Sequence, residues 1–188
     1  MREVIGAGLG PQVSFVGPFG VGKTTAVVTV CPTKVVMTEV FSSTAKAVPG
    51  KHAKATTTVG LEIGEWTAED GTVVCVVGTP GQERFDMVRR SAMPRSSAVV
   101  LWLYGDHAAA LEDAGLWLDF VTREVPSRKL VVALTRTDVS TPIEEIREVV
   151  ASVDPDIPMI AADPRDAESV TEVLKAALAR TSPKQAVG

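Results

Sequence analysis

The chain has 188 residues, of which 45% are apolar and 22% are charged. This length and composition predict one globular domain with a substantial core. The formal net charge of −4 gives no electrostatic reason to expect nucleic acid or an anionic membrane as a direct partner, so neither class is expected.

The cysteines and the chain ends bear on the cellular compartment. Cys31 and Cys75 lie far apart, without a C-x-x-C motif or a histidine at metal spacing, so neither a zinc site nor a disulfide framework is indicated. No apolar run approaches membrane-spanning length, and neither a signal peptide nor a lipidation motif is visible. We expect a cytoplasmic protein that would reach a membrane only through a partner.

The first expected elements surround a glycine-rich loop. A leader over residues 1–11 is expected to be flexible, because no strand precedes its glycines and their spacing does not fit a dinucleotide-binding motif. The next residues predict a strand over Gln12–Val16, and a helix-compatible segment runs from Ala26 to about Val30.

Between this strand and this helix, residues 17–25 read G-P-F-G-V-G-K-T-T, which matches the phosphate-binding loop G-x-x-x-x-G-K-[ST]. Glycines are needed there because successive backbone N–H groups must approach a phosphate closely. The helix N-terminus adds its dipole and unpaired N–H groups. Lys23 is expected to bring a charge to the β- and γ-phosphates, and the Thr24 hydroxyl to ligate Mg²⁺. The alternative is a glycine turn beside a surface lysine.

The loop therefore predicts that the protein binds a nucleoside triphosphate or diphosphate. The nucleotide-binding residues expected within it are Gly17, Phe19, Gly20, Val21, Gly22, Lys23, Thr24 and Thr25.

The middle of the chain predicts a long loop and a hairpin. Residues 32–57 show no clear periodicity, and a segment of this length is usually functional or mobile. An alternating apolar pattern predicts a strand from Val59 to Trp66, and the run Val73–Val77 predicts its hairpin partner. The first of these strands is expected at an edge of the sheet.

The second half alternates apolar strands with helices. Strands are expected at 98–103, 130–134 and 157–160, and helices near 108–125, after 141 and around 170–178. The sequence T-P-I-E at 141–144 is typical of a capping box with proline at the first helical position. Such alternation predicts a mainly parallel sheet covered on both faces, with ligands at the carboxyl ends of the strands. Trp102 and Tyr104 are expected to be core residues.

The string G-T-P-G-Q-E-R-F at residues 78–85 follows the third expected strand. Here the chain resembles the Ras-like small GTPases, whose corresponding motif is D-x-x-G-Q. The resemblance implies that the N–H of Gly81 meets the γ-phosphate and that Gln82 orients the attacking water. The stretch T-V-G-L-E-I at 58–63 resembles the T-I-G-V-D-F of Rab-type proteins, which implies that the Thr58 hydroxyl reaches Mg²⁺. The alternative, a Pro-Gly turn into a polar helix, explains the glycine but not the whole string.

More narrowly, the same string, the triple threonine at 56–58 and the long insertion before it resemble the bacterial Ras-like (CvnD-type, ATP/GTP-binding) proteins of actinobacterial conservons, relatives of MglA. The resemblance covers residues 12–180, with the leader 1–11 and a flexible tail 181–188 outside it. It implies an α/β P-loop NTPase fold with a Ras-like six-stranded, mostly parallel sheet, one antiparallel edge strand and helices on both faces. It also implies a roadblock/LC7-type protein and a sensor-kinase-like protein as partners.

Gly78 stands where the Ras-like motif has its aspartate. In Ras-like proteins that carboxylate holds a water bound to Mg²⁺, so its loss is expected to weaken metal binding, although conservon and MglA-type proteins also lack it. The metal would then depend on Thr24, Thr58 and the phosphates.

The base-recognition motif N-K-x-D reads T-R-T-D at residues 135–138. Asp138 is in place to accept hydrogen bonds from the N1–H and the exocyclic amine of guanine, which adenine does not offer. Its alternative role is to cap a helix. Thr135 replaces the asparagine. Arg136 replaces the lysine that packs along the base, and the longer aliphatic stem of the arginine still permits this packing.

The S-A-K loop of the family is best matched by Asp163, Pro164 and Arg165. The middle residue of that loop gives its backbone N–H to guanine O6, and Pro164 has no N–H. We therefore expect a weakened preference for guanine over adenine. The backbone N–H of Arg165 is a candidate substitute for the missing donor to guanine O6.

Together these residues predict a GTP- and GDP-binding molecular switch with slow, Mg²⁺-dependent hydrolysis, in which Gln82 and Lys23 are catalytic. The alternative is a pseudo-GTPase scaffold that binds partners with little or no turnover, which the substitutions at 78, 135 and 164 favour. A P-loop kinase or ATPase has less support, because no lid-like arginine cluster is visible. Near the expected second helix, a solvated or partner-binding face is expected from Arg84, Arg89, Arg90 and Arg95.

Overall fold

The computed structural model describes most of the expected domain. Only the backbone is described for residues 36–41, 58–60 and 181, and most of the expected leader and tail lies outside the described part. No helix in that part is long and apolar enough to cross a membrane. The described residues are 10–31, 35–41, 58–81, 89–90, 92–106, 109–138 and 141–181.

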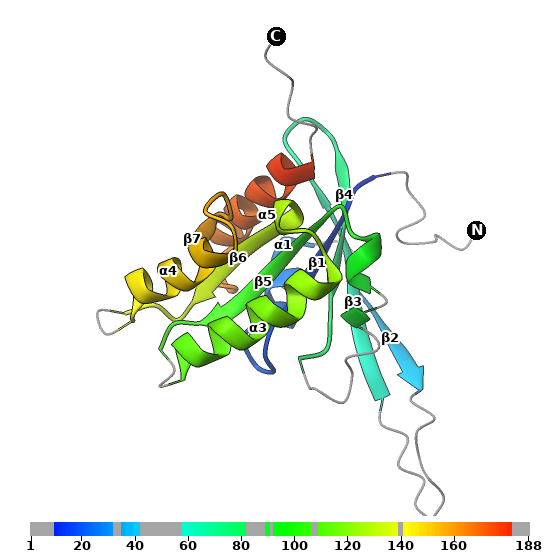
Figure 1. Cartoon of the computed structure of the whole chain (residues 1–188). Helices are drawn as coiled ribbons and strands as arrows, with labels where there is room; N and C mark the ends of the chain where they lie inside the picture. The colour runs from blue at the N-terminus through cyan, green and yellow to red at the C-terminus, as the bar shows by residue number, and fades with distance from the viewer. Residues whose placement is uncertain are drawn as a thin grey trace, which may run out of the picture.

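A seven-stranded sheet in the order β2-β3-β4-β1-β5-β6-β7 forms the centre of the described part (Figure 1). The strand pairs from β4 to β7 are all parallel, and β3 alone runs against its neighbours. The expected mostly parallel sheet with one reversed strand is therefore confirmed. The strands are β1 (Gln12–Val16), β2 (Val36–Phe41), β3 (Thr58–Thr67), β4 (Val73–Gly78), β5 (Ala98–Tyr104), β6 (Leu130–Thr135) and β7 (Met159–Ala161).

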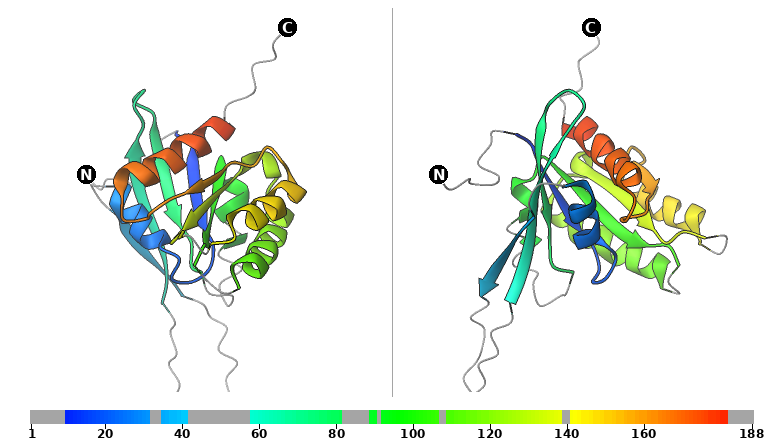
Figure 2. Two further views of the ribbon diagram at one scale, coloured as in Figure 1. Left: turned by 90° about the vertical axis from the view of Figure 1, so that its left-hand side faces the viewer. Right: turned by 180° about the vertical axis from the view of Figure 1, so that it is seen from behind.

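Helices cover both faces of the sheet, as Figure 2 shows from two sides. One face packs against α1 and α5, and the other against α3 and α4. Strand β5 is buried on both faces because its side chains alternate between the two cores: Val100 and Trp102 face α1 and α5, while Leu101 and Leu103 face α3 and α4. The helices are α1 (Lys23–Val30), α3 (Ala110–Glu124), α4 (Ile143–Val153) and α5 (Ala167–Thr181), with 3₁₀ turns η2 (Met93–Arg95) and η3 (Ser127–Lys129).

Strand β2 was not expected, because its residues lie in the segment predicted to be a loop. It pairs antiparallel with β3, from Val36 opposite Ile63 to Phe41 opposite Thr58. The sequence V-M-T-E-V-F has neither a period of two nor a continuous apolar run, so the pairing with β3 rather than the local pattern defines this strand. The sheet therefore has one strand more than expected, and β3 lies one place in from the edge.

The capping box expected at the start of α4 does not form. The helix begins at Ile143 with Pro142 as its N-cap residue and no side-chain hydrogen bond at the cap. The Thr141 hydroxyl instead accepts the backbone N–H of Asp138, at 2.9 Å. The threonine therefore closes the loop between β6 and α4 and fixes the backbone at Asp138.

The two free cysteines give a test of the packing beneath α1. Cys31 is 3% exposed and Cys75 is half-buried. Burial raises the pKa of Cys31 to about 12 and raises the pKa of Cys75 as well. Because the thiolate is the reactive species, we expect iodoacetamide at pH 8 to alkylate Cys75 at least about tenfold faster than Cys31 in the folded protein. Peptide mass spectrometry over time measures both rates, and equal rates before unfolding would contradict the packing described here.

Candidate nucleotide-binding site

The loop between β1 and α1 has a backbone that requires glycine at several positions. Gly17, Gly20 and Gly22 have φ values of 138°, 77° and 108°, in the left-handed region. A Cβ at Gly17 would lie 2.1 Å from the carbonyl oxygen of Trp102, and a Cβ at Gly22 would lie 2.6 Å from Cγ of Pro164. The loop thus lies directly against β5 on one side and against the β7–α5 loop on the other.

Helix α1 begins directly after this loop. Its N-cap residue, Gly22, makes no side-chain capping bond, and the first turn contains no acidic residue. The dipole and the N–H groups of an N-terminus without a side-chain cap favour an anion. This end of α1 therefore meets the physical requirements for holding a phosphate.

Lys23 is buried at the same place. Its Nζ donates hydrogen bonds to the carbonyl oxygens of Gly17, at 2.8 Å, and Pro18, at 2.7 Å. Burial lowers the pKa of Lys23 to about 7, whereas the nearby Glu62 carboxylate raises it and Arg89 lowers it. The amine is held within the loop at the wall of a cavity, where the charge of a phosphate would stabilise its protonated form.

That cavity has a volume of about 330 Å³ and lies between the phosphate-binding loop and the end of β4. Gly81 packs tightly there, since a Cβ on it would lie 2.4 Å from the backbone nitrogen of Phe19. Glu62 of β3 also lines the cavity, although no sequence motif assigns it a role. The lining residues are Phe19, Gly20, Gly22, Lys23, Thr24, Thr25, Glu62, Thr79, Pro80 and Gly81.

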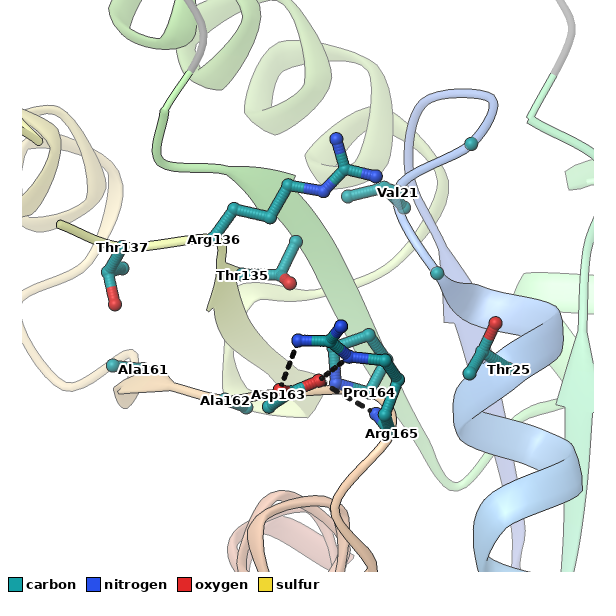
Figure 3. Close-up of a pocket in the computed structure, with 12 residues that line it drawn as sticks. Val21, Thr25, Thr135, Arg136, Thr137, Ala161, Ala162, Asp163, Pro164 and Arg165 are labelled. Atoms are coloured by element: carbon teal, nitrogen blue, oxygen red, sulfur yellow. Dashed lines mark hydrogen bonds and ion pairs between the residues drawn. The ribbon is translucent and has the colours of Figure 1, made fainter.

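A second cavity of about 650 Å³ adjoins the first and shares Gly20, Gly22 and Thr25 with it. Figure 3 shows how the loops after β6 and β7 approach the phosphate-binding loop around this cavity. Asp138 is not among the lining residues. Those residues are Gly20, Val21, Gly22, Thr25, Thr135, Arg136, Thr137, Ala161, Ala162, Asp163, Pro164 and Arg165.

Arg136 and Tyr104 connect this second cavity to the phosphate-binding loop. Arg136 has a φ of 53°, and its guanidinium carbon lies 5.1 Å from the centre of the Tyr104 ring. In Figure 3 the Arg136 side chain extends toward Val21. The Tyr104 hydroxyl donates a hydrogen bond to the carbonyl oxygen of Phe19, at 2.8 Å. Tyr104 was expected in the core, but it is only partly buried and holds the loop from the end of β5.

The loop after β7 has its backbone donors occupied. The N–H of Arg165, the candidate substitute donor to guanine O6, donates to Asp163 Oδ1 at 2.9 Å, and the N–H of Asp163 donates to the Ser169 hydroxyl at 3.0 Å. The N–H of Ala162 donates to the carbonyl of Leu134, at 2.9 Å, and that of Asp166 to the carbonyl of Asp163, at 3.1 Å. Pro164 has no N–H. Each N–H of residues 162–166 therefore already has an acceptor.

Asp163 and Arg165 also form an ion pair at the wall of this cavity, drawn as dashed lines in Figure 3. Arg165 Nε donates to Asp163 Oδ1 at 3.0 Å, and Nη2 donates to Oδ2 at 2.8 Å. These bonds lower the pKa of Asp163 to about 2, so its carboxylate is charged at neutral pH.

Comparisons with solved structures place this arrangement in a known fold. The G domain of the T. maritima FeoB iron transporter superposes with a TM-score of 0.63, over 92% of this chain and 99% of that chain, at 18% sequence identity. The cytosolic domain of the same transporter superposes with TM-scores of 0.61 in its GMPPNP form and 0.60 in its GDP form II, at 17% and 16% identity. This chain has the P-loop GTPase fold.

The comparisons cover nearly all of this chain but not all of the larger relatives. The matched region covers 93% and 95% of this chain, and 65% and 66% of the two cytosolic-domain chains. No protein-family model and no curated protein matches the sequence. The narrower resemblance to the conservon proteins therefore stays a prediction.

Two side chains expected to act in this fold lie outside the described part of the chain. Gln82, the expected catalytic glutamine, lies outside the described residues, and for Thr58 only the backbone at the start of β3 is described. The structure thus brings together the phosphate-binding loop, Gly81 and the loops after β6 and β7, while the positions of these two side chains stay predictions.

Arg89 does not belong to the solvated or partner-binding face expected for the arginines after β4. It is 2% exposed, and its Nη1 donates a hydrogen bond to the carbonyl of Pro80, at 2.8 Å. The guanidinium lies 5.1 Å from the Trp117 ring centre and 5.4 Å from that of Phe120. Arg89 therefore ties the backbone just before Gly81 to α3, a role that no local sequence pattern reveals.

Proposed function

We propose that this protein is a GTP- and GDP-binding switch with slow, Mg²⁺-dependent GTP hydrolysis. The observation that carries the proposal is the pair of adjoining cavities that share Gly20, Gly22 and Thr25. One is lined by the phosphate-binding loop with Lys23, and the other by the loops after β6 and β7, so that together they suit the phosphates and the base of one nucleotide.

The chemistry of the first cavity fits a nucleoside triphosphate with Mg²⁺. Bound Mg²⁺ would neutralise charge on the β- and γ-phosphate oxygens. Lys23 and the N–H groups at the start of α1 would hold the same phosphates, and the Thr24 hydroxyl would be a ligand of the metal. Gly81 would present its N–H to the γ-phosphate, and Gln82 would orient the attacking water. Loss of the γ-phosphate would release Thr58 and Gly81, which is the switching event.

The guanine preference rests mainly on Asp138. Because each N–H of residues 162–166 already has an acceptor, none is left to meet guanine O6 without rearrangement. A charge-assisted hydrogen bond from the base to Asp138 is worth about 1.5–3 kcal/mol, which is roughly 10- to 100-fold in affinity.

We therefore expect GDP to bind about 10- to 100-fold more tightly than ADP, and Asp138→Ala to remove most of this ratio. Competition of each nucleotide against a fluorescent mant-GDP measures the ratio. Thr137→Ala is the matched control, because Thr137 precedes Asp138 in the same loop, lines the cavity and has no carboxylate. A selectivity that survives in Asp138→Ala would show that another group reads the base.

A second candidate function is a pseudo-GTPase scaffold that binds partner proteins with little or no turnover. Gly78 in place of the family's aspartate and the occupied donors of the loop after β7 favour it. In either role we propose a roadblock/LC7-type protein and a sensor-kinase-like protein as partners, and recruitment to a membrane through one of them.

The experiment that tests the proposed function is to denature the freshly purified protein and identify any released nucleotide by chromatography. The same measurement follows incubation with GTP or ATP and Mg²⁺. Retained GDP, or selective conversion of GTP to GDP, supports the switch. Added GTP that stays bound without conversion to GDP supports a nucleotide-holding scaffold. A site that neither nucleotide fills overturns the proposal.

A further inference from the structure

We propose that Glu62 of β3 supplies the carboxylate of the Mg²⁺ site, in place of the aspartate that Gly78 replaces. The inference rests on the proposed function, since a bound nucleotide contributes the remaining ligands. It assigns a metal-site role to a residue on a neighbouring strand.

The sheet places Glu62 directly opposite Gly78. Strands β3 and β4 are antiparallel, and Glu62 pairs with Gly78, the last residue of β4, directly before the residues 79–81 that line the phosphate cavity. Residues paired in this way project to the same face of the sheet, with Cβ atoms about 5 Å apart. A carboxylate on either strand at this register can therefore reach the same space.

The Glu62 carboxylate already occupies the space that a side chain at position 78 would need. A Cβ built on Gly78 would lie 2.5 Å from Glu62 Oε2. Gly78 is not among the glycines with positive φ, so its backbone does not require glycine. The absence of a side chain at 78 makes room for the longer side chain of Glu62.

The carboxylate is also aimed at the residue expected to ligate the metal. The Thr24 hydroxyl donates a hydrogen bond to Glu62 Oε1, at 2.9 Å, and both residues line the phosphate cavity beside Lys23. Because the hydroxyl donates its proton to the carboxylate, the lone pairs of its oxygen stay available to a cation. A hydroxyl, a carboxylate, phosphate oxygens and waters make the all-oxygen ligand set that Mg²⁺ prefers.

The alternative is that Glu62 only orders Thr24 and balances the charge of Lys23. The two roles differ in their dependence on the metal. A carboxylate of the metal site stabilises bound nucleotide only when Mg²⁺ is present, whereas an ordering carboxylate does so with and without Mg²⁺.

The experiment measures the rate at which mant-GDP leaves the full-length protein, in EDTA and across a titration of Mg²⁺. Glu62→Gln keeps the shape of the side chain and an acceptor for Thr24, but removes the charge. The double variant Glu62→Ala/Gly78→Asp moves the carboxylate to β4. Glu65→Gln, on the same strand and outside the cavity lining, is the control.

In Glu62→Gln we expect the Mg²⁺ concentration that gives half of the maximal slowing of mant-GDP release to rise at least about tenfold. The release rate in EDTA should change less than about threefold. Glu65→Gln should match the wild type, and the double variant should recover at least part of the Mg²⁺ response. An unchanged Mg²⁺ midpoint in Glu62→Gln, or equal changes with and without Mg²⁺, would overturn the inference. A wild type that binds no mant-GDP would instead overturn the proposed function itself.

Discussion

Lys23→Ala is expected to lower the affinity for GDP and GTP by at least about 100-fold. The Lys23 amine is buried within the phosphate-binding loop, where its only contacts with hydrogen-bond acceptors described in the structure are the carbonyls of Gly17 and Pro18. Two charge-assisted hydrogen bonds to phosphates would be lost, at about 1.5–3 kcal/mol each. Titration of mant-GDP into nucleotide-free protein measures the change.

The control for this prediction is Lys175→Ala. That lysine is exposed on α5 and pairs with Glu69 and Glu172, away from the loop, so its variant should bind like the wild type. The same Lys23→Ala protein also separates the two candidate functions. A switch loses nucleotide control of its partner, whereas a nucleotide-free scaffold keeps partner binding. Affinity within threefold of the wild type would contradict the assigned role of Lys23.

Gly17→Ala is expected to destabilise the fold by at least about 3 kcal/mol, which is roughly a 10 °C fall in Tm for a domain of this size. Two effects add at this position. The φ of 138° is unfavourable for any residue with a side chain, and the new Cβ would lie 2.1 Å from the backbone carbonyl oxygen of Trp102. That oxygen belongs to the buried strand β5 and cannot move aside without disturbing the sheet.

Gly115→Ala gives the matched control. Gly115 lies within α3, and nothing lies within 4 Å of a Cβ built there. The same substitution should therefore stabilise the protein by about 0.5–1 kcal/mol through helix propensity. Thermal unfolding followed by circular dichroism measures both variants. A Tm for Gly17→Ala close to that of the wild type would show that the loop does not pack on β5 as described.

Much of the fold was predictable because its signals are local. The apolar run 98–103 indicates a strand buried on both faces, and the structure gives β5 (Ala98–Tyr104). The stripe at 170–178 indicates an amphipathic helix, and α5 buries Val170, Val173 and Leu174. Each pattern lies within one element and reports directly on which faces that element buries.

The candidate site was predictable where a motif fixes the backbone. The phosphate-binding loop combines a strand, glycines and a helix start within residues 12–30, and the motif specifies two of its three positive-φ glycines, Gly17 and Gly22. The loops at 135–138 and 163–165 were found only by resemblance. The structure brings residues of both loops to one cavity, because β6 and β7 are parallel neighbours that end at the same edge of the sheet.

Other features depend on residues that are distant in the sequence. Strand β2 exists through its pairing with β3. Tyr104 holds the loop at Phe19 across 85 positions of the chain. No local pattern distinguishes these contacts from their alternatives, because the partner is absent from any short window of sequence.

The sequence by itself predicted the class of ligand, since a phosphate-binding loop needs its glycines, lysine and threonine in one continuous stretch. It also showed that the aspartate of the family pattern is missing at Gly78. Only the tertiary structure decided what stands in that space, because the register between β3 and β4 brings Glu62 opposite Gly78 and to Thr24. The physical reason is that backbone conformation is encoded locally, whereas the neighbours of a side chain are set by how separate strands align.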